Sequence, residues 1–268
     1  MGDADHDDSE LAKWNPGLIE WVGKVLTPIA KLYFRADVRG LERLPTRGGA
    51  LVVSNHSGGA MTPDVLVLAT AFYKTFGYDR PLYTLGHDGL FRTPLAGTLR
   101  QIGVIHATRE NAANALRSGG VVLVFPGGDY DAYRSTFAEN VIDFNGRKGY
   151  VQTAIAADVP IVPTVSIGGQ ETQLFLTRGA WLAKQLRLKR LRTEILPIGF
   201  GLPFGLTSTI PANFPLPSKI VTELLDPIGI AEEFGDNPDI GEVDAHIRSV
   251  MQSALDKLAH DRRFPLLG

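Results

Sequence analysis

The sequence predicts an α/β domain with a mostly parallel central sheet flanked by helices, preceded by an amphipathic helical element. Three short apolar runs, at residues 50–54, 120–125 and 160–165, have the length and composition of strands buried on both faces. Segments with helical periodicity separate these runs, and a polar or glycine-rich loop follows the first two of them. Strands that alternate with helices in this way are typical of a parallel sheet.

The N-terminus divides into two predicted parts. Residues 1–13 carry five carboxylates and are predicted to form a disordered acidic tail. Residues 14–35 are predicted to form an amphipathic helix, which Pro28 should kink because proline removes a backbone donor. Its apolar stripe is formed by Leu18, Val22, Val25 and Ile29. This stripe fits either packing against the core or contact with a membrane interface.

Residues 36–268 are predicted to form a single domain, because no linker interrupts them. Strands are expected at 37–44, 50–54, 81–85, 102–107, 120–125, 160–165 and 219–225. Helices are expected from Thr62-Pro63-Asp64 onward, at 94–100, 109–118 and 147–157, and near the C-terminus. The last helix should bury a stripe formed by Val243, Ile247, Val250, Ala254 and Leu258.

The composition excludes several classes of protein. The 268 residues carry a net charge of −2, are 44% hydrophobic and include no cysteine. Wholesale disorder, a bulk electrostatic grip on nucleic acid, disulfide frameworks, thiolate zinc sites and a cysteine nucleophile are therefore not expected. No metal or resident cofactor is predicted. The acidic N-terminus does not resemble a signal peptide, and no apolar run reaches the roughly 18 residues of a spanning helix.

A second segment suggests contact with a membrane. Residues 174–192 are predicted to form a basic amphipathic helix, and an apolar loop rich in glycine and proline follows at 195–217. A basic helix can also simply be solvated. The residues predicted to contact the membrane, on its cytoplasmic side, are Trp14, Trp21, Phe175, Trp181, Lys184, Arg187 and Arg190.

The first candidate for chemistry is the loop that follows residues 50–54. His56 comes directly after this strand, where α/β folds place ligand-binding loops, and imidazole accepts a proton near neutral pH. Asp64 lies at a predicted helix start, so the loop can bring its carboxylate to the ring. Such a carboxylate fixes the histidine tautomer and stabilises the imidazolium. A histidine in a turn can equally be structural.

Two further loops follow predicted strands. Gly127 and Gly128 follow residues 120–125, and backbone amides there could approach an oxyanion or a phosphate. Arg109 follows residues 102–107, and Arg134 follows the glycine pair. A guanidinium is suited to bidentate binding of phosphate. Taken alone, a glycine-rich turn is usually no more than a turn.

Together these blocks resemble the glycerolipid and lysophospholipid acyltransferase family. Asn55-His56 with a following Asp, residues 103–109, Phe125-Pro126-Gly127-Gly128 and Val159-Pro160-Ile161-Val162-Pro163 occur in the family's order, over residues 36–228. Asn55-His56-Ser57-Gly58-Gly59 and Gly168-Gly169-Gln170-Glu171 look most like the branch with monoacylglycerol and diacylglycerol acyltransferase-like members. The resemblance implies the glycerol-3-phosphate acyltransferase-like fold.

The resemblance also implies a reaction. An acyl group would pass from acyl-CoA or acyl carrier protein, as co-substrate, to 1-acylglycerol-3-phosphate, giving phosphatidic acid at a membrane surface. His56 would be the general base and Asp64 its orienting partner. Amides near Ser57, Gly58, Gly127 and Gly128 would stabilise the oxyanion, and Arg109 and Arg134 would bind the acceptor phosphate. No nucleic-acid partner is implied.

Two departures from the family pattern concern these blocks. The usual spacing places four residues between His and Asp, but seven separate His56 from Asp64, and Met61 occupies the usual Asp position. Gly127 stands where the third block usually has Glu, which leaves Asp129 or Asp131 as replacement carboxylates.

Other functions fit parts of the pattern. An acyltransferase acting on a mono- or diacylglycerol, a noncatalytic lipid-binding module and a serine-type lipid hydrolase are the alternatives. The sequence has no Gly-x-Ser-x-Gly elbow, which argues against the hydrolase. It also has no phosphate loop ending in Gly-Lys-Ser or Gly-Lys-Thr, which argues against a nucleotide-binding enzyme.

Overall fold

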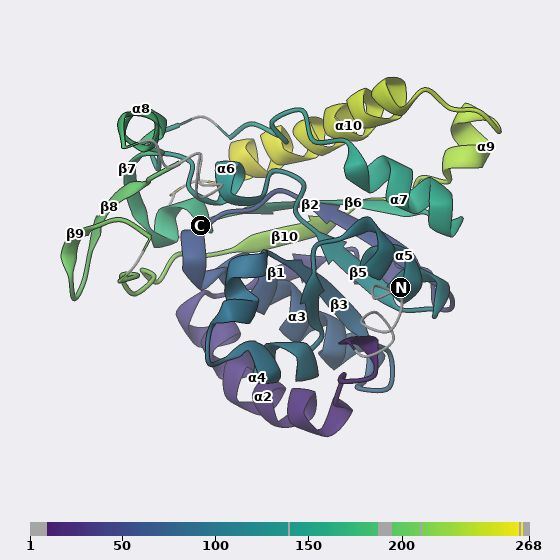
Figure 1. Ribbon diagram of the computed structural model, residues 1–268, viewed down its shortest axis with the longest axis horizontal. Coiled ribbons are helices and arrows are strands. Elements are labelled where there is room, and N and C mark those ends of the chain that lie inside the picture. The colour runs from purple at the N-terminus through teal and green to yellow at the C-terminus, as the bar shows by residue number, and fades with distance from the viewer. Residues whose placement is uncertain (1–9, 139, 187–194, 210, 263, 265–268) are drawn as a thin grey trace.

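The computed structural model describes residues 10–138, 140–186, 195–209, 211–262 and 264. Its centre is a seven-stranded sheet in the order β1-β10-β6-β2-β5-β3-β4, and a separate three-stranded sheet has the order β7-β8-β9. Helices cover both faces of the large sheet, and the small sheet projects at one end of the molecule (Figure 1). The predicted α/β architecture is confirmed.

The large sheet is mostly parallel. Pairings β2–β5, β2–β6, β3–β5, β3–β4 and β1–β10 are parallel, whereas β10 pairs with β6 in the antiparallel sense. Its strands are β1 (Asp37–Arg39), β2 (Ala50–Ser54), β3 (Leu82–Gly86), β4 (Val104–His106), β5 (Val121–Val124), β6 (Ile161–Ile167) and β10 (Val221–Leu224). The first is shorter than the predicted strand 37–44, because Gly40 has a positive φ and a 3₁₀ turn, Leu41–Arg43, follows it.

Helices flank this sheet in two groups. The main helices are α2 (Pro16–Pro28), α3 (Pro63–Phe76), α4 (Ala96–Gln101), α5 (Arg109–Arg117), α7 (Gly149–Ala157) and α10 (Ile240–Asp261), with short helices α6 (Gly128–Ala132), α8 (Ala180–Gln185) and α9 (Ile230–Phe234). Side chains of α5, α7 and α10 belong to the hydrophobic cluster on one face of the sheet, and those of α2 and α3 to the cluster on the other. Side chains of strand β2 alternate between the two clusters, because successive residues of a strand point to opposite faces of the sheet. Leu51 and Val53 belong to the first cluster, and Ala50 and Val52 belong to the second.

The C-terminal helix α10 buries a slightly different stripe from the predicted one. Val243, Ile247 and Leu258 are buried as expected, but Met251 and Leu255 complete the stripe in place of Val250 and Ala254, which are only half-buried. The helix packs mainly on β6. The buried face of the helix is thus shifted by about one residue from the predicted face, which is within the width of an apolar helix face.

The predicted acidic tail is wrong for its last residues. Residues 1–9 lie outside the described part of the chain, but Glu10 is buried. Its carboxylate accepts hydrogen bonds from Arg100 (3.0 Å), from Nδ2 of Asn111 (3.1 Å) and from the backbone of His106 (3.1 Å), and it lies 2.6 Å from Nδ1 of the His106 ring. These contacts fasten the start of the chain to the end of β4.

The N-terminal helix exposes the second half of the stripe that core packing would have buried. Pro28 does interrupt the α-helix, as predicted, and a π-helical segment η2 (Ile29–Tyr33) follows it. The buried side chains are Ile19, Ala30 and Phe34, whereas Val25 and Ile29 are exposed. Leu18 and Val22 are half-buried, so core packing is the wrong interpretation for Val25 and Ile29 but not for the whole stripe.

The predicted basic helix over residues 174–192 is also wrong. Its first residues form strand β7 (Leu174–Thr177), which pairs with β8 (Ile198–Gly201), and β8 pairs with β9 (Gly205–Thr207). Only Ala180–Gln185 is helical in the described part of this segment, and Arg187 and Arg190 lie outside the described residues. Arg178-Gly179 ends the strand, because Gly179 adopts a positive φ against the backbone of Leu196. In the part of the chain that is described, no helix combines the length and apolarity needed to span a membrane.

We expect Glu10→Gln to destabilise the fold. Burial raises the pKa of Glu10, but the hydrogen bonds from Arg100 and His106 outweigh it and leave the pKa below 4.5. This carboxylate therefore contributes stability above its ordinary pKa, which is lost as the pH falls through the lowered value. Glutamine leaves some of these partners without a hydrogen bond, which should lower the free energy of unfolding by about 1–3 kcal/mol. Each kcal/mol corresponds to a fall in Tm of roughly 2–4 °C for a chain of this size.

Thermal unfolding at neutral pH measures this loss. The exposed Glu42→Gln is the matched control and should leave Tm unchanged. Equal Tm values for Glu10→Gln and the wild type would show that the carboxylate does not hold the N-terminal segment.

Candidate active site

His56 and Asp64 meet despite their long separation in sequence. His56 follows the carboxyl end of β2, and Asp64 is the second residue of α3. Nδ1 of His56 lies 2.7 Å from Oδ2 of Asp64, and both side chains are largely buried. The predicted pairing is therefore present in the structure.

The loop between them closes through unusual backbone conformations. Gly58 and Gly59 have φ of 86° and 63°, and Thr62 has φ of 41°. Gly58 also packs so closely on the next helix that an added Cβ would lie 2.5 Å from Cδ of Pro63. Only glycine combines this conformation with this contact at low cost. A 3₁₀ turn, Gly59–Met61, takes up the additional residues, and Pro63 starts α3.

The carboxylate of Asp64 is fixed by three groups. Oδ2 accepts hydrogen bonds from the His56 ring and from the backbone N–H of Ser57 (2.9 Å), and Oδ1 accepts one from the N–H of Val65 (2.9 Å). Its place in the first turn of α3 adds the favourable field of a helix N-terminus. An ionised carboxylate only accepts, so Nδ1 of His56 carries the proton and Nε2 keeps a lone pair.

The environment of His56 favours its role as a base. Burial lowers the pKa of the ring, but the charge and hydrogen bond of Asp64, with the charge of Asp131, outweigh burial and raise the pKa above 6.5. Phe125 stacks on the ring with centroids 4.3 Å apart, which restricts its rotation. The ring is thus held in one orientation and one tautomer, with Nε2 as the basic atom.

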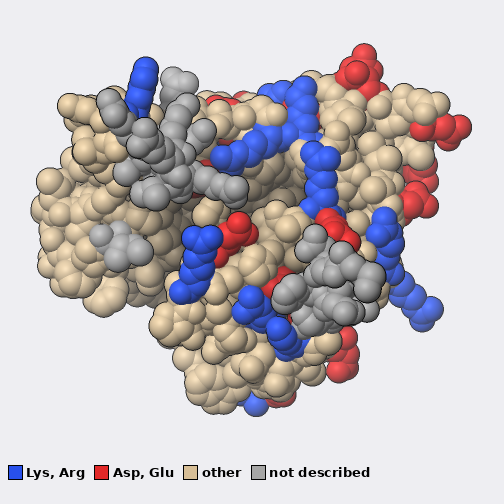
Figure 2. Space-filling view, viewed as in Figure 1, with Lys and Arg blue, Asp and Glu red and all other residues tan. Residues whose placement is uncertain are grey.

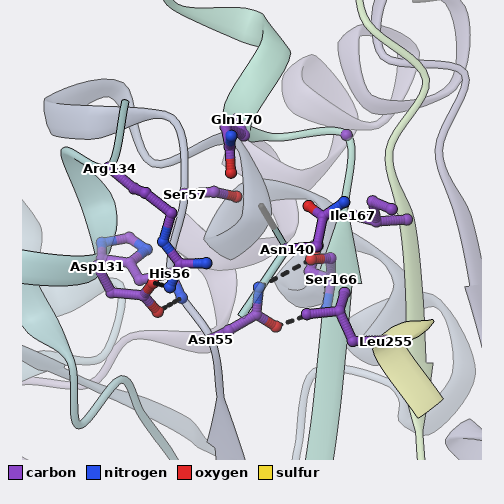
Figure 3. A pocket seen from close by; sticks show the side chains of 11 residues that line it. Asn55, His56, Ser57, Asp131, Arg134, Asn140, Ser166, Ile167, Gln170 and Leu255 are labelled. Atoms are coloured by element: carbon purple, nitrogen blue, oxygen red, sulfur yellow. Dashed lines mark hydrogen bonds and ion pairs between the residues drawn. The ribbon is translucent and has the colours of Figure 1, made fainter. Parts of the chain in front are cut away.

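A second buried carboxylate holds the backbone of the same histidine. Oδ2 of Asp131 accepts a hydrogen bond from the backbone N–H of His56 (2.7 Å), and Oδ1 accepts one from Nη2 of Arg134 (2.5 Å). The dashed lines in Figure 3 mark both interactions. Burial raises the pKa of Asp131 to about 6, while Arg134 and the His56 N–H act against that rise. Of the two candidate replacement carboxylates, Asp131 is therefore the one that contacts His56, whereas Asp129 pairs with Arg147 (3.1 Å).

Gly127 makes the approach of Asp131 possible. A Cβ added at Gly127 would lie 2.6 Å from Cβ of Asp131 and 3.2 Å from the carbonyl oxygen of Asp143. Its neighbour Gly128 has a φ of 50° and accommodates the Arg147 guanidinium. The glycine pair thus serves close packing around the carboxylate.

A small polar pocket adjoins His56. The residues that line it are Asn55, His56, Ser57, Asp131, Arg134, Asn140, Ser166, Ile167, Gly168, Gln170 and Leu255. Figure 3 shows Asp131, Arg134 and His56 gathered on one side, and Asn55 paired with Ser166 on the other. Asn55 forms two hydrogen bonds of 2.8 Å with the backbone of Ser166, which join the catalytic loop to β6.

Several predicted substrate contacts are placed differently. The N–H of Ser57 donates a hydrogen bond to Asp64, and the N–H of Gly128 donates one to the Phe125 carbonyl (3.0 Å). Neither amide is therefore available to a substrate oxyanion. The oxyanion role is therefore contradicted for these two amides, whereas for the amides of Gly58 and Gly127 it stays a prediction. The Ser57 hydroxyl is buried, and among the described residues it has no hydrogen-bond partner, His56 included. A serine nucleophile activated by His56 is therefore not supported.

The two arginines predicted to bind the acceptor phosphate lie in different places. Arg134 lines the pocket, as predicted, but Asp131 engages it. Arg109 is exposed at the start of α5, with its guanidinium beside Gly149 of α7, and it is not among the described residues that line the pocket. It follows β4, three strand positions from β2, or about 14 Å at ordinary strand spacing.

The predicted membrane contacts fall into three groups. Phe175 is buried, because it faces inward from β7 onto Gly59 and Tyr133, so its prediction is wrong. Trp14 is half-buried against both core clusters. Trp21, Trp181 and Lys184 are exposed.

Sequence reasoning missed Asn55 and Phe125 as supports of the site. Both directly follow buried strands, which is a usable signal, but their contacts join segments far apart in the chain. In the described part of the molecule, no cluster of three or more histidine and carboxylate side chains is placed to hold a metal ion.

Comparisons with known proteins show what the chain is similar to. The model of the family described as Acyltransferase matches residues 35–167. An uncharacterized protein of Mycobacterium tuberculosis is 32% identical over 245 residues, which cover 89% of this chain and 65% of that protein. The DGAT1/2-independent enzyme synthesizing storage lipids from Bos taurus is 29% identical, over 73% of this chain and 57% of that protein. The chain thus spans less than two thirds of the length of each of these relatives.

One solved structure shares the fold. The 1-acyl-sn-glycerophosphate (LPA) acyltransferase PlsC from Thermotoga maritima superposes with a TM-score of 0.54, covering 90% of this chain and 81% of its own. The two sequences are 17% identical.

We expect Asp64→Asn to change the pH profile as well as the rate. Removing the negative charge leaves burial opposed only by the charge of Asp131, so the pKa of His56 should fall. The acidic limb of kcat/KM, which reports conversion of His56 to its neutral form, should then move to lower pH. Turnover should drop at least about 100-fold, because the ring loses its correct tautomer.

A pH–rate profile, with NMR titration of the histidine ring in wild type and variant, tests this expectation. Near-normal turnover, or an acidic limb that does not move, would show that the pair does not set the basicity of His56.

Gly127→Ala should displace Asp131 from the His56 backbone. The overpacked methyl group should cost about 1–3 kcal/mol of stability and lower kcat more than KM. Gly97→Ala in α4 is the matched control, since a Cβ there meets nothing within 4 Å. The control should be neutral or slightly stabilising, as alanine favours a helix. Denaturant unfolding and steady-state kinetics measure both, and equal behaviour of the two variants would contradict the packing role of Gly127.

Proposed function

The chain belongs to the Acyltransferase family, and from this premise we propose that it transfers an acyl group from a thioester to a hydroxyl of a glycerolipid. The observation that carries the proposal is the His56–Asp64 pair, which leaves Nε2 of a buried, oriented imidazole as the base. General-base catalysis of this kind contributes about 100- to 10,000-fold.

The chemistry requires no covalent enzyme intermediate. Nε2 of His56 takes the proton of the acceptor hydroxyl as its oxygen attacks the thioester carbonyl. The tetrahedral intermediate then expels the thiolate, to which His56 returns the proton. Asp64 stabilises the imidazolium between these two steps. The donor is a thioester of coenzyme A or of a carrier protein.

The geometry favours a neutral acceptor, a mono- or diacylglycerol. A phosphate group would need cations beside His56, but Arg134 is already engaged by Asp131 and Arg109 lies toward α7. The family likeness to an enzyme whose name refers to storage lipids agrees with a neutral product. Drawing Arg134 away from Asp131 would leave a buried carboxylate without its partner, which is strongly unfavourable.

The second candidate acceptor is 1-acylglycerol-3-phosphate, with phosphatidic acid as the product. Arg134 lines the pocket, and a phosphate could exchange with Asp131 when that carboxyl is protonated near its pKa of about 6. We place either reaction at the cytoplasmic surface of a membrane, where these lipids reside.

An acceptor panel tests the proposal. Purified protein is given radiolabelled oleoyl-CoA or oleoyl carrier protein with monoacylglycerol, diacylglycerol, lysophosphatidic acid or glycerol 3-phosphate. We expect product from the neutral acylglycerols, with a rate that His56→Ala lowers at least about 100-fold. Preference for lysophosphatidic acid would support the second candidate, and transfer to none of the four, with the fold intact by circular dichroism, would contradict the proposal.

A further inference from the structure

The motif Gly168-Gly169-Gln170-Glu171 follows β6 and contacts several distant parts of the chain. Gly169 packs against the loop that carries His56, since an added Cβ would lie 2.2 Å from Oγ of Ser57. Glu171 forms an ion pair of 2.5 Å with Arg262 at the end of α10. The proposed reaction uses none of these contacts, so the role of the motif depends on what it holds in place.

Gln170 is the member of the motif that lines the polar pocket. Its Nε2 atom lies within hydrogen-bond distance of three backbone carbonyls, those of Ser135 (3.0 Å), Thr136 (3.0 Å) and Ala138 (3.1 Å). Three acceptors around one atom identify it as the amide nitrogen, because the amide oxygen cannot donate. The side chain therefore holds a whole segment, residues 135–138, which follows Arg134 directly in the chain.

The middle of this segment is also bound to the small sheet. The N–H of Thr136 donates to the carbonyl of Phe175 (3.0 Å), and the N–H of Phe175 donates to the hydroxyl oxygen of Thr136 (2.9 Å). Gln170, in contrast, also holds the carbonyls at the two ends of the segment, at Ser135 and Ala138. Loss of the Gln170 amide should thus loosen the ends of the segment without detaching it from β7.

Arg134 joins this segment to the support of His56. It is only 8% exposed, whereas many lysine and arginine side chains stand out on the surface shown in Figure 2. A buried guanidinium needs a fixed partner, and Oδ1 of Asp131 is one such partner. In Figure 3, Gln170 lies at one end of the pocket, and Arg134 extends toward Asp131. The other oxygen of Asp131 accepts the backbone N–H of His56.

We propose that Gln170 is a positioning residue for acyl transfer. It holds residues 135–138, which fixes Arg134, and through the Arg134–Asp131 pair it fixes the backbone of His56. Its expected effect on the rate rests on the proposed function, whereas the positioning itself is a property of the folded chain.

The Arg134–Asp131 pair can transmit this effect because both of its members are buried. Burial raises the pKa of Asp131 to about 6, and Arg134 acts against this rise. If Arg134 moves away, Asp131 is protonated more readily, and its hydrogen bond with the N–H of His56 weakens. A displacement of about 1 Å in a catalytic group can lower a rate by about 100-fold.

Gln170→Met tests the proposal, because methionine keeps the length of the side chain but removes the donor. Gln252→Met is the matched control. Gln252 of α10 holds a later part of the same loop, accepting from the N–H of Ile142 (2.8 Å) and donating to the carbonyl of Asn140 (3.1 Å). Each variant loses the hydrogen bonds of one glutamine to this loop, so both should lower Tm.

The two variants should differ in their kinetics. We expect Gln170→Met to lower kcat about 10-fold and to leave KM within about twofold, because the position of His56 changes and not the binding of substrate. Gln252→Met should leave both constants within about twofold of the wild type, since its contacts lie farther along the chain from Arg134.

A second measurement does not depend on catalysis. The backbone amide proton of His56 is hydrogen bonded to a carboxylate. Its NMR resonance should move upfield in Gln170→Met, where this bond lengthens, and should keep its position in Gln252→Met.

Two results would overturn the proposal: equal kcat values for Gln170→Met and Gln252→Met, or a His56 amide resonance that Gln170→Met leaves in place. Circular dichroism checks that each variant is folded. If Gln170→Met is not, Gln170→Asn replaces it, because asparagine keeps the amide but withdraws it by one methylene group. The NMR measurement requires no acyl transfer, so failure of the positioning role and failure of the proposed function are distinguishable.

Discussion

The hydrogen bond between His56 and Asp64 sets the conditions for the rest of this site. It buries a carboxylate beside an imidazole, and such a pair is stable only when every other polar contact is also made. Asp64 meets this condition through the amides of Ser57 and Val65 and the start of α3. The Ser57 amide is consequently occupied by the carboxylate and does not face the pocket as a free donor.

A second carboxylate completes the support of His56 from another part of the chain. Asp131 reaches the His56 backbone from α6, while Asp64 holds the ring from α3. The histidine is thus fixed at two points by two separate elements, which limits both its position and its rotation. Because Asp131 also engages Arg134, the positive charge of the pocket is largely balanced, and this balance is the basis for expecting a neutral acceptor.

The small sheet connects the chemistry with the surface of the molecule. Its inner face supports the catalytic loop through Phe175, and its outer face carries Phe200 and Leu206. The small sheet therefore contacts the loop that joins His56 to Asp64 on one face and is exposed on the other.

The sequence alone determined the elements whose signals are local. Residues 50–54 are apolar throughout and form a strand covered on both faces, and Pro63 marks the start of α3 because its φ suits a first helical turn. The sequence also identified His56 and Asp64, since a strand end and a helix start are both readable. It misjudged residues 174–192, where alternating and helical patterns overlap over a short span, and the acidic N-terminus, where the partners of Glu10 lie some 90 residues away. Only the tertiary structure decided which face of the N-terminal helix is covered, which of Asp129 and Asp131 contacts His56, and which arginine reaches the pocket. Those outcomes depend on contacts between distant segments, and local periodicity carries no information about them.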